Sequence, residues 1–135
     1  MKIFKNYELT LINQNATILE ALNQINSFPD NFLSRFMLFV KSDNESIIGS
    51  LTDGDIRRAL TKNKDLHIKV SKICNKNFTY EFYTDNYLNL SVFKNKGINI
   101  LPILDKKKRF KNLIDLDKIN AMLPLECVIM AGGFG

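Results

Sequence analysis

The sequence predicts an α+β fold made of two βαββα repeats that pack together with pseudo-twofold symmetry. Strand-like and helix-like segments follow one another in the same order in both halves of the chain. The two halves also superimpose in sequence at an offset of 63 positions. A three-stranded sheet covered on one side is marginal by itself, so two such units are expected to pack together within these 135 residues.

The first half is predicted to form a strand, a helix, two strands and a helix. Its strands are expected at residues 9–12, 36–40 and 46–51, the last two forming a hairpin. Thr17 is a good N-cap and Glu20 follows three residues later, so this capping-box pattern predicts a helix over residues 18–26. The turn at 52–55 carries two aspartates, which suit the positive end of a helix that begins at Ile56.

The second half repeats this order. Its strands are expected at residues 78–82, 98–104 and 110–114, and its last helix at 116–122. Asp85 is the expected N-cap of a helix that carries Leu88, Val92 and Phe93. Gly97 follows at the position that glycine often takes after a helix C-terminus.

The overlay of the two halves is gapless from the hairpin onward. It places residues 38–40 on residues 101–103, and Thr52 on Asp115. Before the hairpin the first half has extra residues around 28–35. The expected boundaries are a first repeat within residues 1–66, a second within 67–122, and a different segment over 123–135.

Composition narrows the class of function. Lys and Arg number 19 and Asp and Glu 14, a formal net charge of +5 that suits a small anionic ligand. The one dense basic run, 106–109, lies between two strands and is interpreted as a solvated turn, so we expect no nucleic-acid partner. A single His67 and no C-x-x-C pattern argue against a metal site or a catalytic triad.

The expected location is the cytoplasm. The two cysteines, Cys74 and Cys127, lie far apart, which is typical of a reduced protein without a disulfide scaffold. No stretch reaches the roughly 18 apolar residues of a membrane span, and the N-terminus lacks an apolar signal core. We therefore expect no membrane partner.

Two motifs carry a family resemblance. Residues 49–60 contain a glycine in a strand, then Thr-x-x-Asp, then a helix, and residues 97–105 follow the pattern G-x-x-x-x-P-I-x-D. These patterns resemble the CBS domain, the module named after cystathionine β-synthase. The resemblance covers about residues 9–122 and implies a tandem CBS pair.

Residues 52–60 look like CBS pairs attached to sugar-phosphate enzymes, the sugar-phosphate nucleotidyltransferases and the arabinose-5-phosphate isomerases. Residues 125–135 read as a strand followed by a glycine-rich loop, similar to the start of nucleotidyltransferases, whose loop holds phosphates through backbone amides. In the isomerases the sugar domain precedes the CBS pair. Residues 123–135 are therefore expected to be the truncated start of a nucleotidyltransferase domain, and the chain a non-catalytic regulatory module of that enzyme.

The candidate ligand-binding residues are Thr52, Asp55, Arg57 and Arg58. A carboxylate accepts hydrogen bonds from vicinal ribose hydroxyls, a threonine hydroxyl can meet a ribose or phosphate oxygen, and arginines add positive charge. The resemblance implies AMP, ADP or ATP in the cleft between the repeats. No catalytic residue, metal ligand or cofactor is expected.

A purely structural interpretation of the same residues remains open. Thr52 then caps the helix, Asp55 completes a capping box, and the arginines are surface residues. In the second repeat Asp115 stands at the threonine position and Lys118 at the aspartate position, so a ribose acceptor is missing and at most one well-formed site is expected. The alternative function is therefore a ligand-free dimerisation module of the same enzyme; a homodimer is expected in either case.

Overall fold

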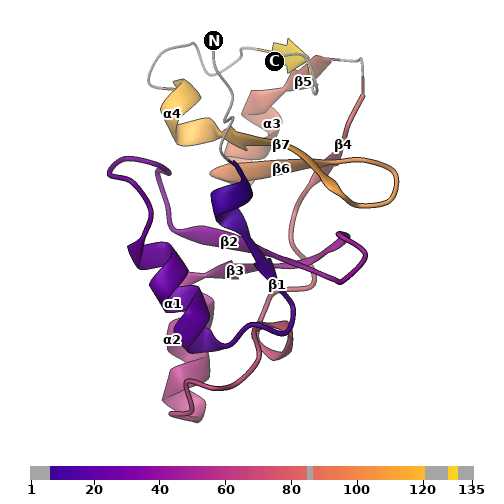
Figure 1. The fold of residues 1–135 in the computed structure, drawn as a ribbon. Helices are drawn as coiled ribbons and strands as arrows, with labels where there is room; N and C mark the ends of the chain where they lie inside the picture. Colours follow the sequence, from indigo (N-terminus) through magenta and orange to yellow (C-terminus); the bar gives the residue numbers. More distant parts are fainter. Residues whose placement is uncertain (1–6, 85–86, 121–127, 131–135) are drawn as a thin grey trace. The chain divides into compact units, whose positions relative to one another are not determined.

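The computed structural model describes residues 7–84, 87–120 and 128–130 (Figure 1). Its contacts divide these residues into two compact units. One unit is Glu8–Phe78, and the other contains Tyr7 and the described residues from Thr79 onward. None of the helices in these ranges is long and apolar enough to cross a membrane.

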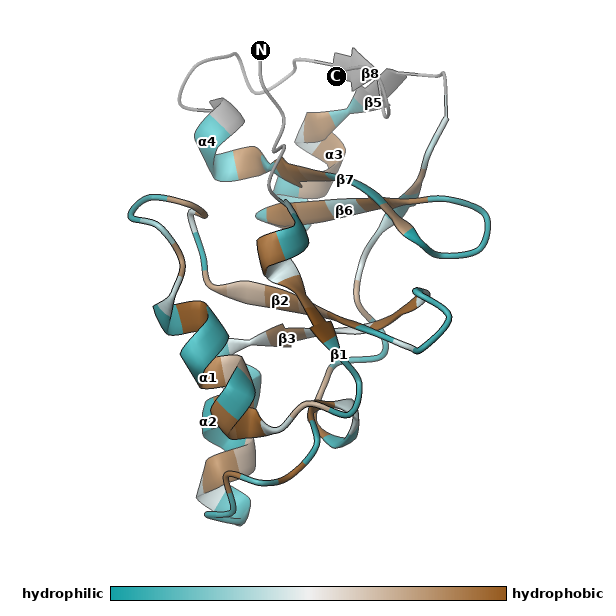
Figure 2. Cartoon of the chain, viewed as in Figure 1, coloured by the Kyte–Doolittle hydropathy of each residue, from teal (hydrophilic) through white to brown (hydrophobic). Residues whose placement is uncertain are grey.

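The first unit contains a three-stranded sheet with two helices. Its elements are η1 (Tyr7–Thr10), β1 (Leu11–Asn13), α1 (Ile18–Asn26), β2 (Met37–Lys41), β3 (Ile47–Thr52), α2 (Asp53–Lys62) and η2 (Val70–Lys72), where η marks a 3-10 helix. The strand order is β1-β2-β3, with β1 parallel and β3 antiparallel to β2. Apolar residues of both helices and all three strands form one buried cluster. Figure 2 shows hydrophobic residues along these strands, and hydrophilic residues at the turn between β2 and β3.

Capping side chains set where both helices of this unit begin. The N–H of Glu20 donates to Oγ1 of Thr17 at 3.2 Å, so α1 covers the predicted residues 18–26. The second helix begins at Asp53 instead of the predicted Ile56, because its N-cap is Thr52. The predicted hairpin is confirmed by the antiparallel pairing of β2 with β3.

The second unit repeats the same arrangement. Its elements are β4 (Glu81–Phe82), β5 (Tyr87–Asn89), α3 (Leu90–Asn95), β6 (Ile100–Leu104), β7 (Phe110–Asp115), α4 (Leu116–Asn120) and β8 (Val128–Met130). The strand order is β4-β6-β7, with β4 parallel and β7 antiparallel to β6. A separate antiparallel pair joins β5 to β8. The predicted α+β class with two βαββ-type halves is confirmed.

Two predictions for the second half were wrong in detail. The strand expected at 78–82 contains only Glu81 and Phe82. The helix expected to carry Leu88 begins at Leu90, because Asn89 accepts the N–H of Ser91 at 3.1 Å and becomes the N-cap. The expected cap, Asp85, lies outside the described residues. The predicted role of Gly97 at the C-terminus of this helix is confirmed, since Gly97 follows α3 with a φ of +77°.

The 63-residue offset is confirmed by the strand pairing. Leu38 pairs with Leu51, and their counterparts Leu101 and Ile114 pair in the same register. Each ladder contains one irregularity, and the two irregularities are also 63 positions apart, at Val40/Lys41 and Ile103/Leu104. The two hairpins therefore have the same register and the same position of the register irregularity.

The extra residues of the first half lie between its first two strands. Ile12 pairs with Val40, whereas the corresponding pair in the second unit is Glu81 with Ile103. The first separation is six residues longer than the second. The additional chain lies in the connection between α1 and β2, as the gap in the sequence overlay predicted.

The turns of the two hairpins share one conformation. In both residues 42–46 and residues 105–109, the first residue donates its N–H to the carbonyl of the fifth at 2.8 Å. The fourth residue of each turn is left-handed, with φ of 67° at Glu45 and 62° at Lys108. The basic run 106–109 is exposed, as expected for a solvated turn.

The segment after α2 packs on the first unit, so the contacts place a boundary after Phe78, whereas the sequence overlay placed the repeat boundary at 66/67. Val70 is fully buried in the first core, and Asn75 exchanges two backbone hydrogen bonds with Ser50. This pairing needs a glycine at position 49, because a Cβ there would lie 2.6 Å from Sγ of Cys74. The glycine of the sequence motif thus permits a close approach of two chain segments.

Candidate functional site

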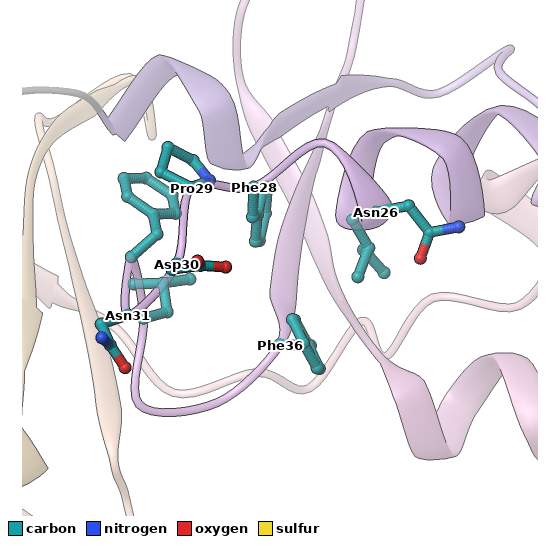
Figure 3. A pocket seen from close by; sticks show the side chains of 9 residues that line it. Asn26, Phe28, Pro29, Asp30, Asn31 and Phe36 are labelled. Atoms are coloured by element: carbon teal, nitrogen blue, oxygen red, sulfur yellow. The ribbon is translucent and has the colours of Figure 1, made fainter.

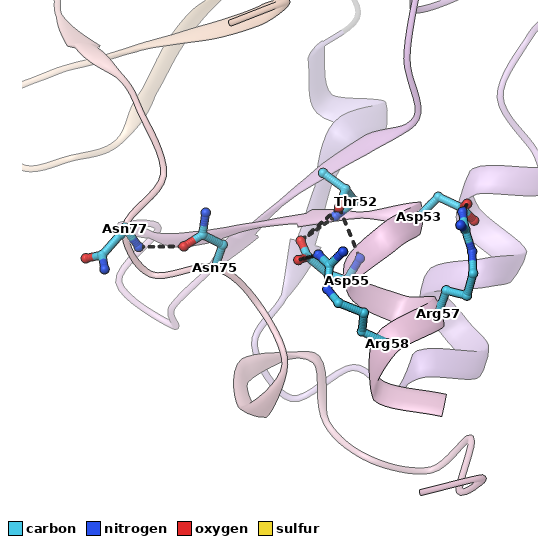
Figure 4. Close-up of polar contacts among 7 residues, drawn as sticks. All are labelled: Thr52, Asp53, Asp55, Arg57, Arg58, Asn75 and Asn77. Atoms are coloured by element: carbon cyan, nitrogen blue, oxygen red, sulfur yellow. Dashed lines mark hydrogen bonds and ion pairs between the residues drawn. The ribbon is translucent and has the colours of Figure 1, made fainter. Parts of the chain in front are cut away.

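Thr52 and Asp55 form a reciprocal capping box at the start of α2 (Figure 4). The N–H of Asp55 donates to Oγ1 of Thr52 at 3.1 Å, and the N–H of Thr52 donates to Oδ2 of Asp55 at 3.0 Å. The threonine hydroxyl also donates to Oδ2 at 3.0 Å. This polar group is built by local sequence, because Thr52 ends β3 and Asp55 is the third residue of the helix.

The two arginines of the motif have different partners. Nη2 of Arg58 lies 2.7 Å from Oδ1 of Asp55, whereas Arg57 is ion-paired with Asp53. Figure 4 shows the two pairs apart from each other. The Arg58 side chain is 71% exposed while that of Asp55 is 16% exposed, so the arginine can move away from a carboxylate that stays in place. The structure thus gathers Thr52, Asp55 and Arg58, and leaves Arg57 outside the group.

A hollow of about 320 Å³ adjoins Asp55 along α2. It is lined by Asp55, Arg58, Ala59, Lys62, Lys72 and Ile73. The sequence interpretation missed the two lysines. Lys62 lies seven positions after Asp55 and therefore on the same helix face, a signal that helical spacing alone could have given. Lys72 comes from η2, and only the packing of residues 67–78 on the first unit brings it to the hollow.

A second hollow, of about 390 Å³, lies in the long α1–β2 connection (Figure 3). It is lined by Ile25, Asn26, Phe28, Pro29, Asp30, Asn31, Phe32, Leu33 and Phe36. The rings of Phe28 and Phe32 meet edge-on with centroids 5.0 Å apart, and Phe36 is 56% exposed. The sequence had predicted only an irregular connection here.

The corresponding turn of the second unit differs in charge. Oδ1 of Asp115 accepts the N–H of Lys118 at 3.3 Å, so Asp115 takes the capping role that Thr52 has in the first unit. Lys118 occupies the position of Asp55, and the neighbouring Asp117 is ion-paired with Lys94. The second unit therefore has a capped helix start but no carboxylate where Asp55 stands.

Other chemistry-bearing groups are few in the part of the chain that the structure describes. No group of three or more His, Cys, Asp or Glu side chains there could hold a metal ion. Burial raises the pKa of the Cys74 thiol, outweighing the opposite effect of the nearby Lys76. A protonated, half-buried thiol is a poor nucleophile.

Similarity to known proteins is found at the level of structure. No family model and no curated protein matches the sequence. The CBS domains of a transcriptional regulator from Streptococcus pneumoniae match with a TM-score of 0.66 and 10% identity, over 88% of this chain and 92% of that one. The cytosolic domain of the Mg²⁺ channel MgtE, in complex with ATP, matches with a TM-score of 0.66 and 16% identity, over 84% of this chain and 44% of that one.

A third match is the CBS domain pair of protein MJ0100, in complex with 5′-methylthioadenosine and S-adenosyl-L-methionine. It aligns with a TM-score of 0.61 and 17% identity, over 90% of this chain and 96% of that chain. At identities this low, the structural similarity shows the fold alone. Together with the two duplicated βαββ units and their matching hairpins, it shows that this chain has the fold of a tandem CBS-domain pair.

Proposed function

We propose that the chain is an adenine-nucleotide-sensing CBS pair that regulates a sugar-phosphate nucleotidyltransferase and has no catalytic activity itself. The observation that carries the nucleotide part is the group formed by Thr52, Asp55 and Arg58 at the start of α2. Support comes from two proteins of the same fold, since the MgtE domain is in complex with ATP and the MJ0100 pair with two other adenosine compounds.

The geometry indicates how a nucleotide would bind. Oδ2 of Asp55 accepts two hydrogen bonds within the capping box, whereas Oδ1 accepts one from the exposed Arg58. A ribose hydroxyl that donates to Oδ1 would displace the guanidinium, which then becomes available to a phosphate. The capping box would hold the carboxylate in place during this exchange.

Calorimetry with AMP, ADP and ATP tests the proposal. We expect dissociation constants between micromolar and millimolar, roughly −8 to −4 kcal/mol. Asp55→Ala removes a charged acceptor and should cost about 1.5–3 kcal/mol, a ten- to hundred-fold loss of affinity. Since Asp55 also caps α2, Asp55→Asn serves as a second variant that keeps one acceptor oxygen for the N–H of Thr52.

Lys118→Ala is the matched control, because it changes the equivalent position of the second unit, where no ribose acceptor stands. Its nucleotide affinity should equal that of the wild type. The proposal fails if no adenine nucleotide binds at millimolar concentration, or if both Asp55 variants bind as tightly as the wild type.

The transferase part rests on residues 125–135 and their resemblance to a nucleotidyltransferase start. Within this segment β8 (Val128–Met130) is a strand, as the pattern predicted, and the glycine residues of the loop lie outside the described ranges. We expect no pyrophosphate release from this chain with any sugar phosphate. A longer form of the protein that includes a transferase domain should release pyrophosphate at a rate that changes with added adenine nucleotide.

A second candidate function is a homodimerisation module of the same enzyme without a ligand. The capping box favours it, because Thr52 and Asp55 satisfy each other without a bound molecule. Sedimentation and melting curves distinguish the two functions. A dimer whose melting temperature is unchanged by millimolar AMP, ADP or ATP would favour the structural module, whereas a concentration-dependent rise would favour nucleotide sensing.

A further inference from the structure

The hollow beside α2 carries an excess of positive charge. Three of its six lining side chains are cationic, namely Arg58, Lys62 and Lys72, and one, Asp55, is anionic. The carboxylate is already paired with Arg58. Among the described residues no ion pair joins Lys62 or Lys72 to a carboxylate, and both side chains are exposed. Two lysines thus face one hollow with no acidic partner of their own.

The two lysines that line the hollow come from different elements. Lys62 is at the end of α2, on the same helix face as Asp55, and Lys72 is at the end of η2. The η2 wall is fixed because Val70 is buried in the core and the N–H of Val70 donates to the carbonyl of Ala16 at 2.8 Å. Both lysines therefore line the same hollow, and an anion bound in it would be attracted by both positive charges.

Size and lining indicate which anion fits. A hollow of about 320 Å³ is at the lower end of the range for small-molecule pockets. Its apolar lining is limited to Ala59 and Ile73, so it offers no platform for a base. A chain of phosphate groups matches both its charge and its lack of aromatic surface.

We propose that this hollow is a polyphosphate subsite, and that through it the module binds ATP in preference to AMP. The inference rests on the proposed nucleotide function, because Asp55 belongs to both places. Its Oδ2 faces Thr52 in the capping box and its Oδ1 faces Arg58 in the hollow. A ribose held at Asp55 would have its phosphate chain beside Arg58, Lys62 and Lys72, and each added phosphate would gain a charged partner.

Calorimetry in magnesium-free buffer at low ionic strength tests the subsite, since neither metal nor salt then masks the phosphate charge. The ligands are AMP, ATP and inorganic tripolyphosphate, and the variants are Lys62→Ala, Lys72→Ala and their combination. Lys64→Ala is the matched control, because it removes an exposed lysine that does not line the hollow. The wild type and the Lys64→Ala control should bind ATP about tenfold or more tightly than AMP. The double variant should bind the two nucleotides equally, with its AMP affinity unchanged.

The outcomes separate this inference from the proposed function. If AMP and ATP bind the wild type with equal affinity, or if the double variant keeps its ATP preference, the subsite is refuted while nucleotide sensing stands. If tripolyphosphate binds and the double variant loses it, but neither nucleotide binds better than tripolyphosphate alone, the hollow binds polyphosphate and the ribose role of Asp55 fails. If Lys64→Ala loses as much of the ATP preference as the Lys62 and Lys72 variants do, the preference depends on net charge alone and the subsite is refuted.

Discussion

Replacing Gly49 by alanine should destabilise the first unit. The new Cβ would lie 2.6 Å from Sγ of Cys74 and 3.1 Å from the backbone carbonyl oxygen of Asn75. Overpacking of this kind costs about 1–3 kcal/mol. If the segment moves away instead, the two backbone hydrogen bonds between Ser50 and Asn75 weaken, at about 1 kcal/mol each. We therefore expect a loss of about 1–3 kcal/mol in the free energy of unfolding, measured by urea denaturation.

Two variants show whether the clash is the cause. Gly54→Ala is the same chemical change, but the three atoms nearest to its Cβ all belong to the guanidinium of the exposed Arg58, the closest being Nη1 at 3.2 Å. This side chain can move aside, so stability should be unchanged or rise by up to about 1 kcal/mol. Adding Cys74→Ala to Gly49→Ala removes the nearest atom and should recover part of the loss. A Gly49→Ala protein as stable as the wild type would refute the reasoning, as would an equal loss from Gly54→Ala.

Three further predictions concern capping, pH and thiol reactivity. Thr52→Ala removes the N-cap of α2 and should lower the free energy of unfolding by about 0.5–2 kcal/mol in urea; an unchanged midpoint would contradict the capping role. Hydrogen bonds to the Asp105 carboxylate, above all from the backbone N–H of Arg109, lower the pKa of Asp105 from its ordinary value of 3.8. The stability that these bonds add is present above pH 3.8 and is lost as the pH falls through the lower pKa of the folded state. The melting temperature should therefore fall more steeply with acid in the wild type than in Asp105→Asn. In a Cys127→Ser background, Cys74 should react with an aromatic disulfide reagent at pH 8 more slowly than free cysteine, because burial raises its pKa, and an equal rate would show that the thiol is accessible and ionised.

Local signals in the sequence predicted the elements that local interactions determine. The Thr17 and Glu20 pair defined α1 because a capping side chain acts within one helical turn. The overlay of the halves predicted the hairpin register because the side-chain pattern of a strand admits no slip of one residue. The beginning of α3 was missed, since Asn89 and Asp85 are equally good capping residues and only the position of β5 selects the first.

The candidate site was predictable in part for the same reason. Thr52 and Asp55 contact each other across one turn, which their spacing implies. Arg57 and Arg58 are adjacent in sequence but point about 100° apart on a helix, so only one of them could reach Asp55. Lys72 enters the hollow through the packing of a segment remote in sequence, and no local pattern signals that approach.

The duplicated hairpin turns differ completely in sequence. Residues 42–46 read Ser-Asp-Asn-Glu-Ser and residues 105–109 read Asp-Lys-Lys-Lys-Arg, with no identity at any of the five positions. The first carries a formal charge of −2 and the second, with four basic residues and one acidic, +3. Both nevertheless adopt one backbone path, with a left-handed residue that is not glycine at the fourth position. The two turns therefore share a backbone path without sharing side chains, so the charge at the tip of the hairpin can differ between the units while the backbone of the turn stays the same.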